Sequence, residues 1–178
     1  MVEFAIIAPI FFALVFAIVE SALMFFAGQL LETVAEDSAR VIMTGQAQTP
    51  GQVPACQVAG NPTAQACTQD TFKAVVCSKL PTLFDCSKLY VDVRSYGDSF
   101  TGITNQNYID ISKNFTPDMQ YNTGGPGSVV VVQLFYQWPQ VVTGLGFNFT
   151  NLAGGMRLLV ATVAFKNEPY IASASSGP

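Results

Sequence analysis

The sequence predicts an α+β protein in which one long N-terminal helix packs on a small antiparallel sheet beside a disulfide-stapled loop. Three observations lead to this prediction. An apolar run of membrane length opens the chain, all four cysteines lie within residues 56–86, and β-rich segments separated by Gly and Pro fill the second half. A helix followed by a run of strands, without alternation of the two, is typical of α+β folds.

The first expected element is a transmembrane segment over residues 1–27. Phe4 to Ala27 is 24 residues long and carries a single charge, on Glu20. As a helix this run would measure about 36 Å, enough to cross a hydrocarbon core of about 30 Å. A cleaved signal peptide would have a shorter apolar core that follows positive charge. A plain single-span anchor explains the length but not the presence of Glu3.

Three residues of this segment need a separate explanation. Glu3 places a carboxylate at the mouth of an apolar helix, which is costly in lipid and indicates a role in assembly. Pro9 removes a helix hydrogen bond and predicts a kink or a packing role, which membrane helices tolerate. Glu20 either reaches water near the far interface of the membrane or pairs within an assembly.

The helix is expected to continue beyond the membrane as an amphipathic stretch over residues 28–48 and to end near Gly45. Apolar or small residues recur at spacings of three and four, and the charged residues fall off this stripe. That period is typical of a helix that lies on a folded domain. The stripe contains Leu31, Val34, Ser38, Val41 and Ile42, and the charged residues are Glu32, Glu36, Asp37 and Arg40.

The four cysteines, Cys56, Cys67, Cys77 and Cys86, indicate disulfides. None forms a Cys-x-x-Cys pair of the kind found in zinc or redox sites. An even number of cysteines in a segment outside the cytoplasm is typical of disulfide bonding. The pairs Cys56–Cys67 and Cys77–Cys86 are favoured because both close local loops. The sequence leaves the other two pairings open, and four reduced cysteines are the alternative.

The remainder is expected to form one periplasmic or extracellular α+β domain over residues 49–170. A serine-rich flexible tail follows over residues 171–178. Within the domain, the apolar spacing predicts a short helix over residues 70–79 that stops before Pro81.

Four segments have the composition or alternation of strands. Residues 89–96 alternate apolar and polar side chains, which predicts a strand with one solvent-exposed face. Residues 108–112 show a weaker alternation. The clearest strand covers residues 128–138, which are nearly all β-branched or aromatic, and the last covers residues 156–166. Three or four antiparallel strands are therefore expected.

Composition and charge argue against several classes of function. The net charge of −4 and the pI near 4.5 argue against nucleic acid as a partner. The chain has no histidine, the commonest general base and metal ligand. No catalytic residue, metal site or cofactor is predicted, and Asp92 and Asp98 are interpreted as solvated charges. Phe135, Tyr136 and Trp138 are interpreted as sheet core and rim.

Three blocks of the chain resemble one family. Residues 2–9, Val-Glu-Phe-Ala-Ile-Ile-Ala-Pro, are similar to the V-E-F-A-x-x-x-P opening of TadE-like pseudopilins. Residues 37–46, which contain Ala-Arg and end in Thr-Gly-Gln, resemble the A-A-R-x-x-x-T-G end of that family's helix, with Ser38 replacing an alanine. Residues 161–170 resemble the family's closing block. That block ends here in Lys166, Asn167, Glu168, Pro169 and Tyr170.

This resemblance implies a minor pilin, or pseudopilin, of the tight-adherence (Tad/Flp) type IV pilus system. Such proteins are made as prepilins, are cut by a membrane peptidase, and help to initiate, prime or tip the pilus used in surface adhesion. The implied partners are a short major pilin, a second minor pilin, the inner-membrane assembly platform, the prepilin peptidase and the lipid bilayer. The implied location is the bacterial inner membrane, with the C-terminal domain in the periplasm or carried outside the cell in the pilus.

The resemblance also implies a role for Glu3. In related pilins, the acidic residue at the fifth mature position neutralises the N-terminal amine of a neighbouring subunit. A carboxylate in lipid costs several kcal/mol unless it is protonated or paired. The chain departs from the family pattern because only two residues precede Glu3 and no basic leader with a cleavage-site glycine is present. Either the sequence starts late or the cut falls elsewhere.

The alternative function is a membrane-anchored, adhesin-like binding module that does not enter a filament. This hypothesis predicts that the soluble domain binds a ligand without the helix. The assembly hypothesis instead makes the helix indispensable. A monomeric anchored domain would tolerate replacement of residues 1–27 by any other transmembrane helix.

Overall fold

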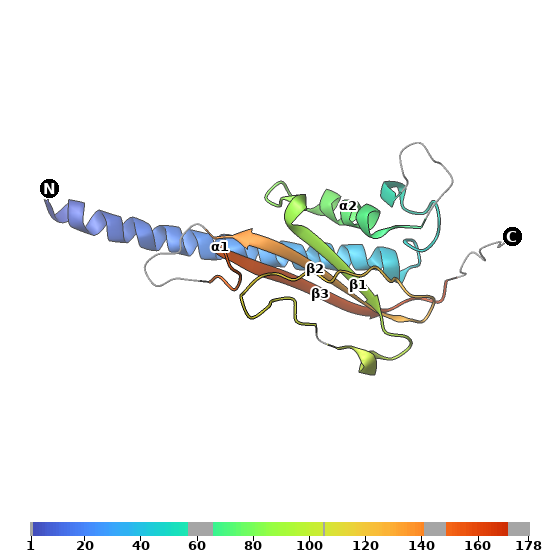
Figure 1. The fold of residues 1–178 in the computed structure, drawn as a ribbon. Helices are drawn as coiled ribbons and strands as arrows, with labels where there is room; N and C mark the ends of the chain where they lie inside the picture. The colour runs from blue at the N-terminus through green and yellow to red at the C-terminus, as the bar shows by residue number, and fades with distance from the viewer. Residues whose placement is uncertain (1, 57–65, 105, 141–148, 171–178) are drawn as a thin grey trace.

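In the computed structural model, one helix runs most of the length of the molecule and carries a three-stranded sheet beside its C-terminal half (Figure 1). The structure describes residues 2–56, 66–104, 106–140 and 149–170. This architecture confirms the predicted α+β class. The helices are α1 (Val2–Met43) and α2 (Gln69–Lys79), the strands are β1 (Leu89–Ser95), β2 (Val129–Pro139) and β3 (Met156–Lys166), and short 3-10 turns cover Pro54–Cys56, Cys86–Lys88 and Phe100–Gly102.

Helix α1 is a single element of 42 residues that passes from the apolar segment into the amphipathic stretch. It ends at Met43, two residues before the expected end at Gly45. Gly45 adopts a φ of +77°, and its N–H donates to the carbonyl of Ile42 at 3.0 Å. A left-handed glycine just past the last turn is a common helix terminator, because it lacks the Cβ that would clash there.

The three strands form one antiparallel sheet in the order β1-β2-β3. Val132 at the centre pairs with Val93 on one side and with Val163 on the other. Helix α1 packs on β3 and β2, and α2 packs on β1. Both helices contribute to one apolar core with the same face of the sheet. The predicted position of the amphipathic half-helix on a sheet face is therefore confirmed.

Helix α2 is fixed at both ends and by one disulfide. Thr68 caps its N-terminus in a reciprocal capping box with Thr71, which satisfies backbone donors that a helix end leaves free. At the other end, Nζ of Lys79 donates to the carbonyl of Asp37 in α1 at 3.0 Å. Cys77 bonds to Cys86 and ties the helix to the chain that precedes β1.

The second disulfide joins Cys56 to Cys67, whose Cα atoms are 5.0 Å apart. Both bonds are the local pairings that the sequence favours. Each closes a short loop, so each removes conformational freedom mainly from the unfolded chain. Residues 57–65, inside the first of these loops, and the tail over residues 171–178 lie outside the described residues.

The face of β1 that the alternation predicts to be solvent-exposed is covered, so that prediction is wrong. Asp92 is only 1% exposed. The long connection between β1 and β2 folds back across this face, and a second apolar cluster forms beneath it. The cluster contains Tyr108, Phe135, Leu152 and Leu158. The alternation along a strand shows which residues are polar, but whether they are exposed to solvent depends on a loop that is distant in the sequence.

The prediction of a strand over residues 108–112 is also wrong. Ile109 forms an isolated antiparallel bridge with Phe115, and the chain between them turns back on itself. The Asp110 carboxylate accepts hydrogen bonds from the backbone N–H groups of Ser112 at 2.8 Å and Asn114 at 2.7 Å. An aspartate that binds backbone donors ahead of it stabilises a turn in competition with an extended strand.

Candidate functional site

The N-terminal half of α1 presents large apolar side chains over most of its surface, and within it Ala17 and Met24 are buried. Phe4 is 74% exposed and Phe25 is 73% exposed, and the exposed large apolar residues between them range from 37% at Val15 to 69% at Ile18. By length and composition this helix is able to cross a membrane. The exposed large apolar residues of this half are Phe4, Ile6, Ile7, Ile10, Phe11, Phe12, Leu14, Val15, Phe16, Ile18, Val19, Leu23, Phe25 and Phe26.

The three residues singled out in this segment all lie on α1. Glu3 is in its first turn, and its side chain lies outside what the structure describes. Pro9 is exposed within the helix, two turns further along. Glu20 is half-buried, near the level at which the folded domain begins to cover the helix. The roles assigned to them remain predictions.

The C-terminal half of α1 is covered along one stripe, and small residues dominate this stripe. Ala27, Ala35 and Ser38 are completely buried, and so are Leu31 and Ile42. Small side chains allow the helix backbone to approach a facing element closely, and the larger residues fill the remaining gaps. The predicted charged residues of this stretch, Glu32, Glu36, Asp37 and Arg40, are exposed on the opposite side.

The end of α1 is attached to the C-terminal block that the sequence singles out. The backbone N–H of Glu168 donates to the carbonyl of Met43 at 2.9 Å, so one of the free carbonyls at the end of the helix gains a partner. The ring of Tyr170 lies against Gly45, at the site where a Cβ would stand. Lys166 ends β3, and both it and Pro169 are exposed.

Asn167 links the C-terminal block to the Gly-rich turn before β2 by hydrogen bonds. It is 3% exposed, and its Nδ2 donates to the carbonyls of Thr123 at 2.9 Å and Gly125 at 3.0 Å. Nε2 of Gln48, just past α1, donates to the carbonyls of Thr123 and Ile42, both at 3.2 Å. The end of α1, the Gly-rich turn and the closing block therefore meet at one point, although they are far apart in the sequence.

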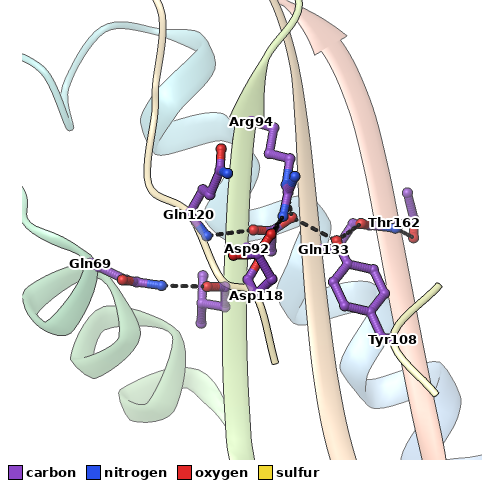
Figure 2. A network of polar contacts seen from close by, with 9 residues as sticks. Gln69, Asp92, Arg94, Tyr108, Asp118, Gln120, Gln133 and Thr162 are labelled. Atoms are coloured by element: carbon purple, nitrogen blue, oxygen red, sulfur yellow. Dashed lines mark hydrogen bonds and ion pairs between the residues drawn. The ribbon is translucent and has the colours of Figure 1, made fainter. Parts of the chain in front are cut away.

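A second polar site lies on the other face of the sheet, centred on the Asp92 carboxylate (Figure 2). Its Oδ2 accepts from Nε of Arg94 at 2.8 Å and lies 3.0 Å from the hydroxyl of Tyr108. Its Oδ1 accepts from the backbone N–H of Gln120 at 2.6 Å. The Tyr108 hydroxyl also lies 3.2 Å from Oε1 of Gln133, so its single proton is shared between two acceptors.

This network holds the β1–β2 connection on the sheet. Arg94 also contacts Asp118 in that connection, through the backbone carbonyl and through the carboxylate at 3.5 Å. Gln133 extends the network to β3, because its Nε2 donates to the Thr162 hydroxyl at 3.1 Å. The charged and polar atoms of Asp92 and its neighbours satisfy one another, which is the condition for a buried charge to be tolerated.

The ionisation of the network follows from this geometry. Burial lowers the pKa of Arg94, but the hydrogen bond and negative charge of Asp92 outweigh burial and the pKa is raised. Burial, and then the hydrogen bond to Asp92, raise the pKa of the Tyr108 phenol well above its usual value. Both residues therefore keep their protons throughout the physiological range.

Together these features define a class of protein. One N-terminal helix supplies an exposed apolar segment of membrane length and continues into a small disulfide-bonded domain, so the chain is an α+β protein with a candidate membrane-spanning helix. The model of the TadE-like protein family matches residues 1–40, so the chain is similar to that family over most of α1. No curated protein and no solved structure matches the chain.

Proposed function

We propose that this chain is a minor pilin of a Tad-type IV pilus that helps to initiate, prime or tip the filament. The observation that carries this proposal is the largely exposed apolar half of α1, joined without a break to a folded domain. On a monomer, an apolar surface of this extent marks a membrane or protein interaction site. Before assembly the surface would face lipid, and in a filament it would face the helices of other subunits.

The assembly role assigns residues 1–27 to the membrane, residues 28–48 to the junction, and residues 49–170 to a domain on the far side of the inner membrane. The partners would be a short major pilin, a second minor pilin, the assembly platform, the prepilin peptidase and lipid. The role is structural, and no step of it requires catalysis. Two local disulfides suit a domain that works outside the reducing cytoplasm.

Glu3 is the residue that should distinguish assembly from simple anchoring. In a filament its carboxylate would pair with the N-terminal amine of a neighbouring subunit. Loss of a charge pair in an apolar setting costs several kcal/mol, and each 1.4 kcal/mol is a factor of about ten in an equilibrium constant. Glu3→Ala should therefore leave the chain in the membrane fraction and reduce its amount in sheared filaments by roughly tenfold or more.

Quantitative mass spectrometry on sheared filaments and on membranes tests this prediction. Glu36→Ala is the matched control, because it removes the same group from the exposed side of α1 beyond the membrane segment. Normal filament incorporation of Glu3→Ala would contradict the pairing. Detection of the parent chain in membranes alone, and never in filaments, would contradict the minor-pilin proposal and favour an anchored module.

A further inference from the structure

The end of the sheet where β2 stops and β3 begins points toward the N-terminus of α1 (Figure 1). Phe149, just before β3, comes close to the apolar half of the helix. It lines one shallow, largely apolar pocket of about 200 Å³ together with Leu14, Ala17, Ile18 and Ser21 of α1. The ring of Phe149 is still 39% exposed. The folded domain therefore reaches the segment that is long enough to cross a membrane.

The depth of this contact follows from helix geometry. A hydrocarbon core of about 30 Å corresponds to about 20 helical residues, so a core that begins at Phe4 ends near Leu23. Ala17 and Ser21 then lie about 9 Å and 3 Å inside the boundary on the domain side, at 1.5 Å per residue. Phe149 packs at this level, which is the depth that apolar side chains of interfacial elements reach.

The chemistry of this end of the sheet suits the same environment. No Asp, Glu, Lys or Arg occurs between Asp118 and Arg157. Nη1 of Arg157 donates to the carbonyl of Phe149 at 2.7 Å, and the N–H of Leu158 donates to Oδ1 of Asn151 at 2.7 Å. Irregular backbone near lipid needs such internal partners. The half-buried Arg157 also places a cation where a long side chain reaches the headgroups.

We propose that the β2–β3 end of the sheet is a second membrane contact, in which Phe149 inserts into the leaflet nearest the domain. Arg157 lies at the level of the phosphates, and an acyl chain of a phospholipid occupies the pocket between Phe149 and α1. The proposal rests on the proposed membrane anchoring by α1. Two contact points, the helix and Phe149, fix the rotation and tilt of the domain against the bilayer.

Depth-dependent fluorescence quenching tests this inference on the full chain in phosphatidylcholine vesicles with brominated acyl chains. One tryptophan is added at a time, as Phe149→Trp, Phe12→Trp or Phe100→Trp, and the signal of the native Trp138 in the parent chain is subtracted. Phe12 lies within the expected span and is 52% exposed. Phe100 is 53% exposed but lies on the 3-10 turn of the β1–β2 connection, far from α1 (Figure 1).

The Phe12→Trp signal should be quenched by bromines near the end of the acyl chain. The Phe149→Trp signal should be quenched several-fold more than the Phe100→Trp signal, and most by bromines close to the headgroup. Equal quenching at positions 149 and 100, with strong quenching at position 12, would overturn the second contact and leave the anchor intact. Absence of quenching at position 12 would overturn both the anchor and the inference that rests on it.

Discussion

The two halves of α1 have the same backbone but opposite surroundings. From Phe4 to Phe26, large apolar side chains cover most of the helix surface, and Ala17 and Met24 are the buried residues among the side chains that the structure describes there. From Ala27 to Met43, a stripe rich in alanine is buried, and the charges lie opposite it. Bulky branched and aromatic side chains suit lipid, whereas small ones suit close approach of a sheet. One continuous helix therefore has a first half suited to lipid and a second half suited to packing against a sheet.

The continuity of the helix has a mechanical consequence. No break in α1 separates the halves, since the helix runs unbroken from Val2 to Met43. The domain is fixed to the second half by the buried stripe and to its end by the contacts of Glu168 and Tyr170. A force on the first half, such as extraction from a membrane, would therefore reach the domain directly and without a flexible linker.

The largest expected difference between the two halves of α1 is in the loss of unfolding free energy when one leucine in each half is truncated to alanine. Leu31 is fully buried, whereas Leu23 is 44% exposed. Leu31→Ala removes core contacts and leaves a cavity, which should cost about 2–5 kcal/mol. Leu23→Ala should change the free energy of unfolding of the domain by less than about 0.5 kcal/mol.

Thermal unfolding of the full chain in a mild detergent, followed by near-ultraviolet circular dichroism, measures both effects. Leu31→Ala should lower the Tm by roughly 5–15 °C, and Leu23→Ala should leave it almost unchanged. Equal shifts for the two variants would show that the detergent-facing half is as tightly packed as the other, and the division of α1 would be wrong.

The next largest changes in stability are expected for alanine substitutions at two glycines, and the two changes should have opposite signs. Gly28 lies within α1 and has open space where a Cβ would stand, so Gly28→Ala should stabilise the helix by up to about 1 kcal/mol. Gly45 has a φ of +77°, and a Cβ there would overlap the ring of Tyr170. Gly45→Ala should therefore destabilise the domain by about 1–3 kcal/mol.

The same unfolding assay distinguishes the two glycine variants by the direction of the Tm shift. Gly45→Ala combined with Tyr170→Ala removes the overlap but keeps the positive φ, so the double variant separates steric clash from backbone strain. A neutral Gly45→Ala would mean that the attachment of the closing block to the helix end is loose.

Most of the architecture could be predicted because it depends on local periodicity. The stripe of α1, the helix before Pro81 and the strands at residues 89–96, 128–138 and 156–166 each have a period or a composition that one segment carries by itself. The errors arise where distant segments meet. Nothing near Asp92 in the sequence indicates that Gln120, 28 residues later, would cover it.

The residues at the end of α1 and in the closing block could be singled out from the sequence, but the contacts between them could not, because those contacts join distant segments. The closing block was singled out by its resemblance alone, and its bond to Met43 joins residues that are more than a hundred positions apart. The Asp110 turn could have been found, because an aspartate followed by Ser112 and Asn114 is a turn signal as well as part of an alternation. The depth of Phe149 beside α1 has no signal in the sequence beyond the lack of charge around it.

The smallest expected effect is a gain in stability at Ser38, the residue that stands where the resembling family has alanine. Ser38 is completely buried, and its hydroxyl has no hydrogen-bond partner among the described residues. Ser38→Ala removes an unsatisfied polar group and adds helix propensity, so it should stabilise the domain by about 0.5–1.5 kcal/mol. The matched control is Ser21→Ala, because the Ser21 hydroxyl already donates to the carbonyl of Ala17 at 2.8 Å. A rise in Tm for Ser38→Ala without one for Ser21→Ala would confirm that the buried stripe is dry. A fall in Tm for Ser38→Ala would instead mean that this hydroxyl has a partner, such as a buried water, at the interface between α1 and the sheet.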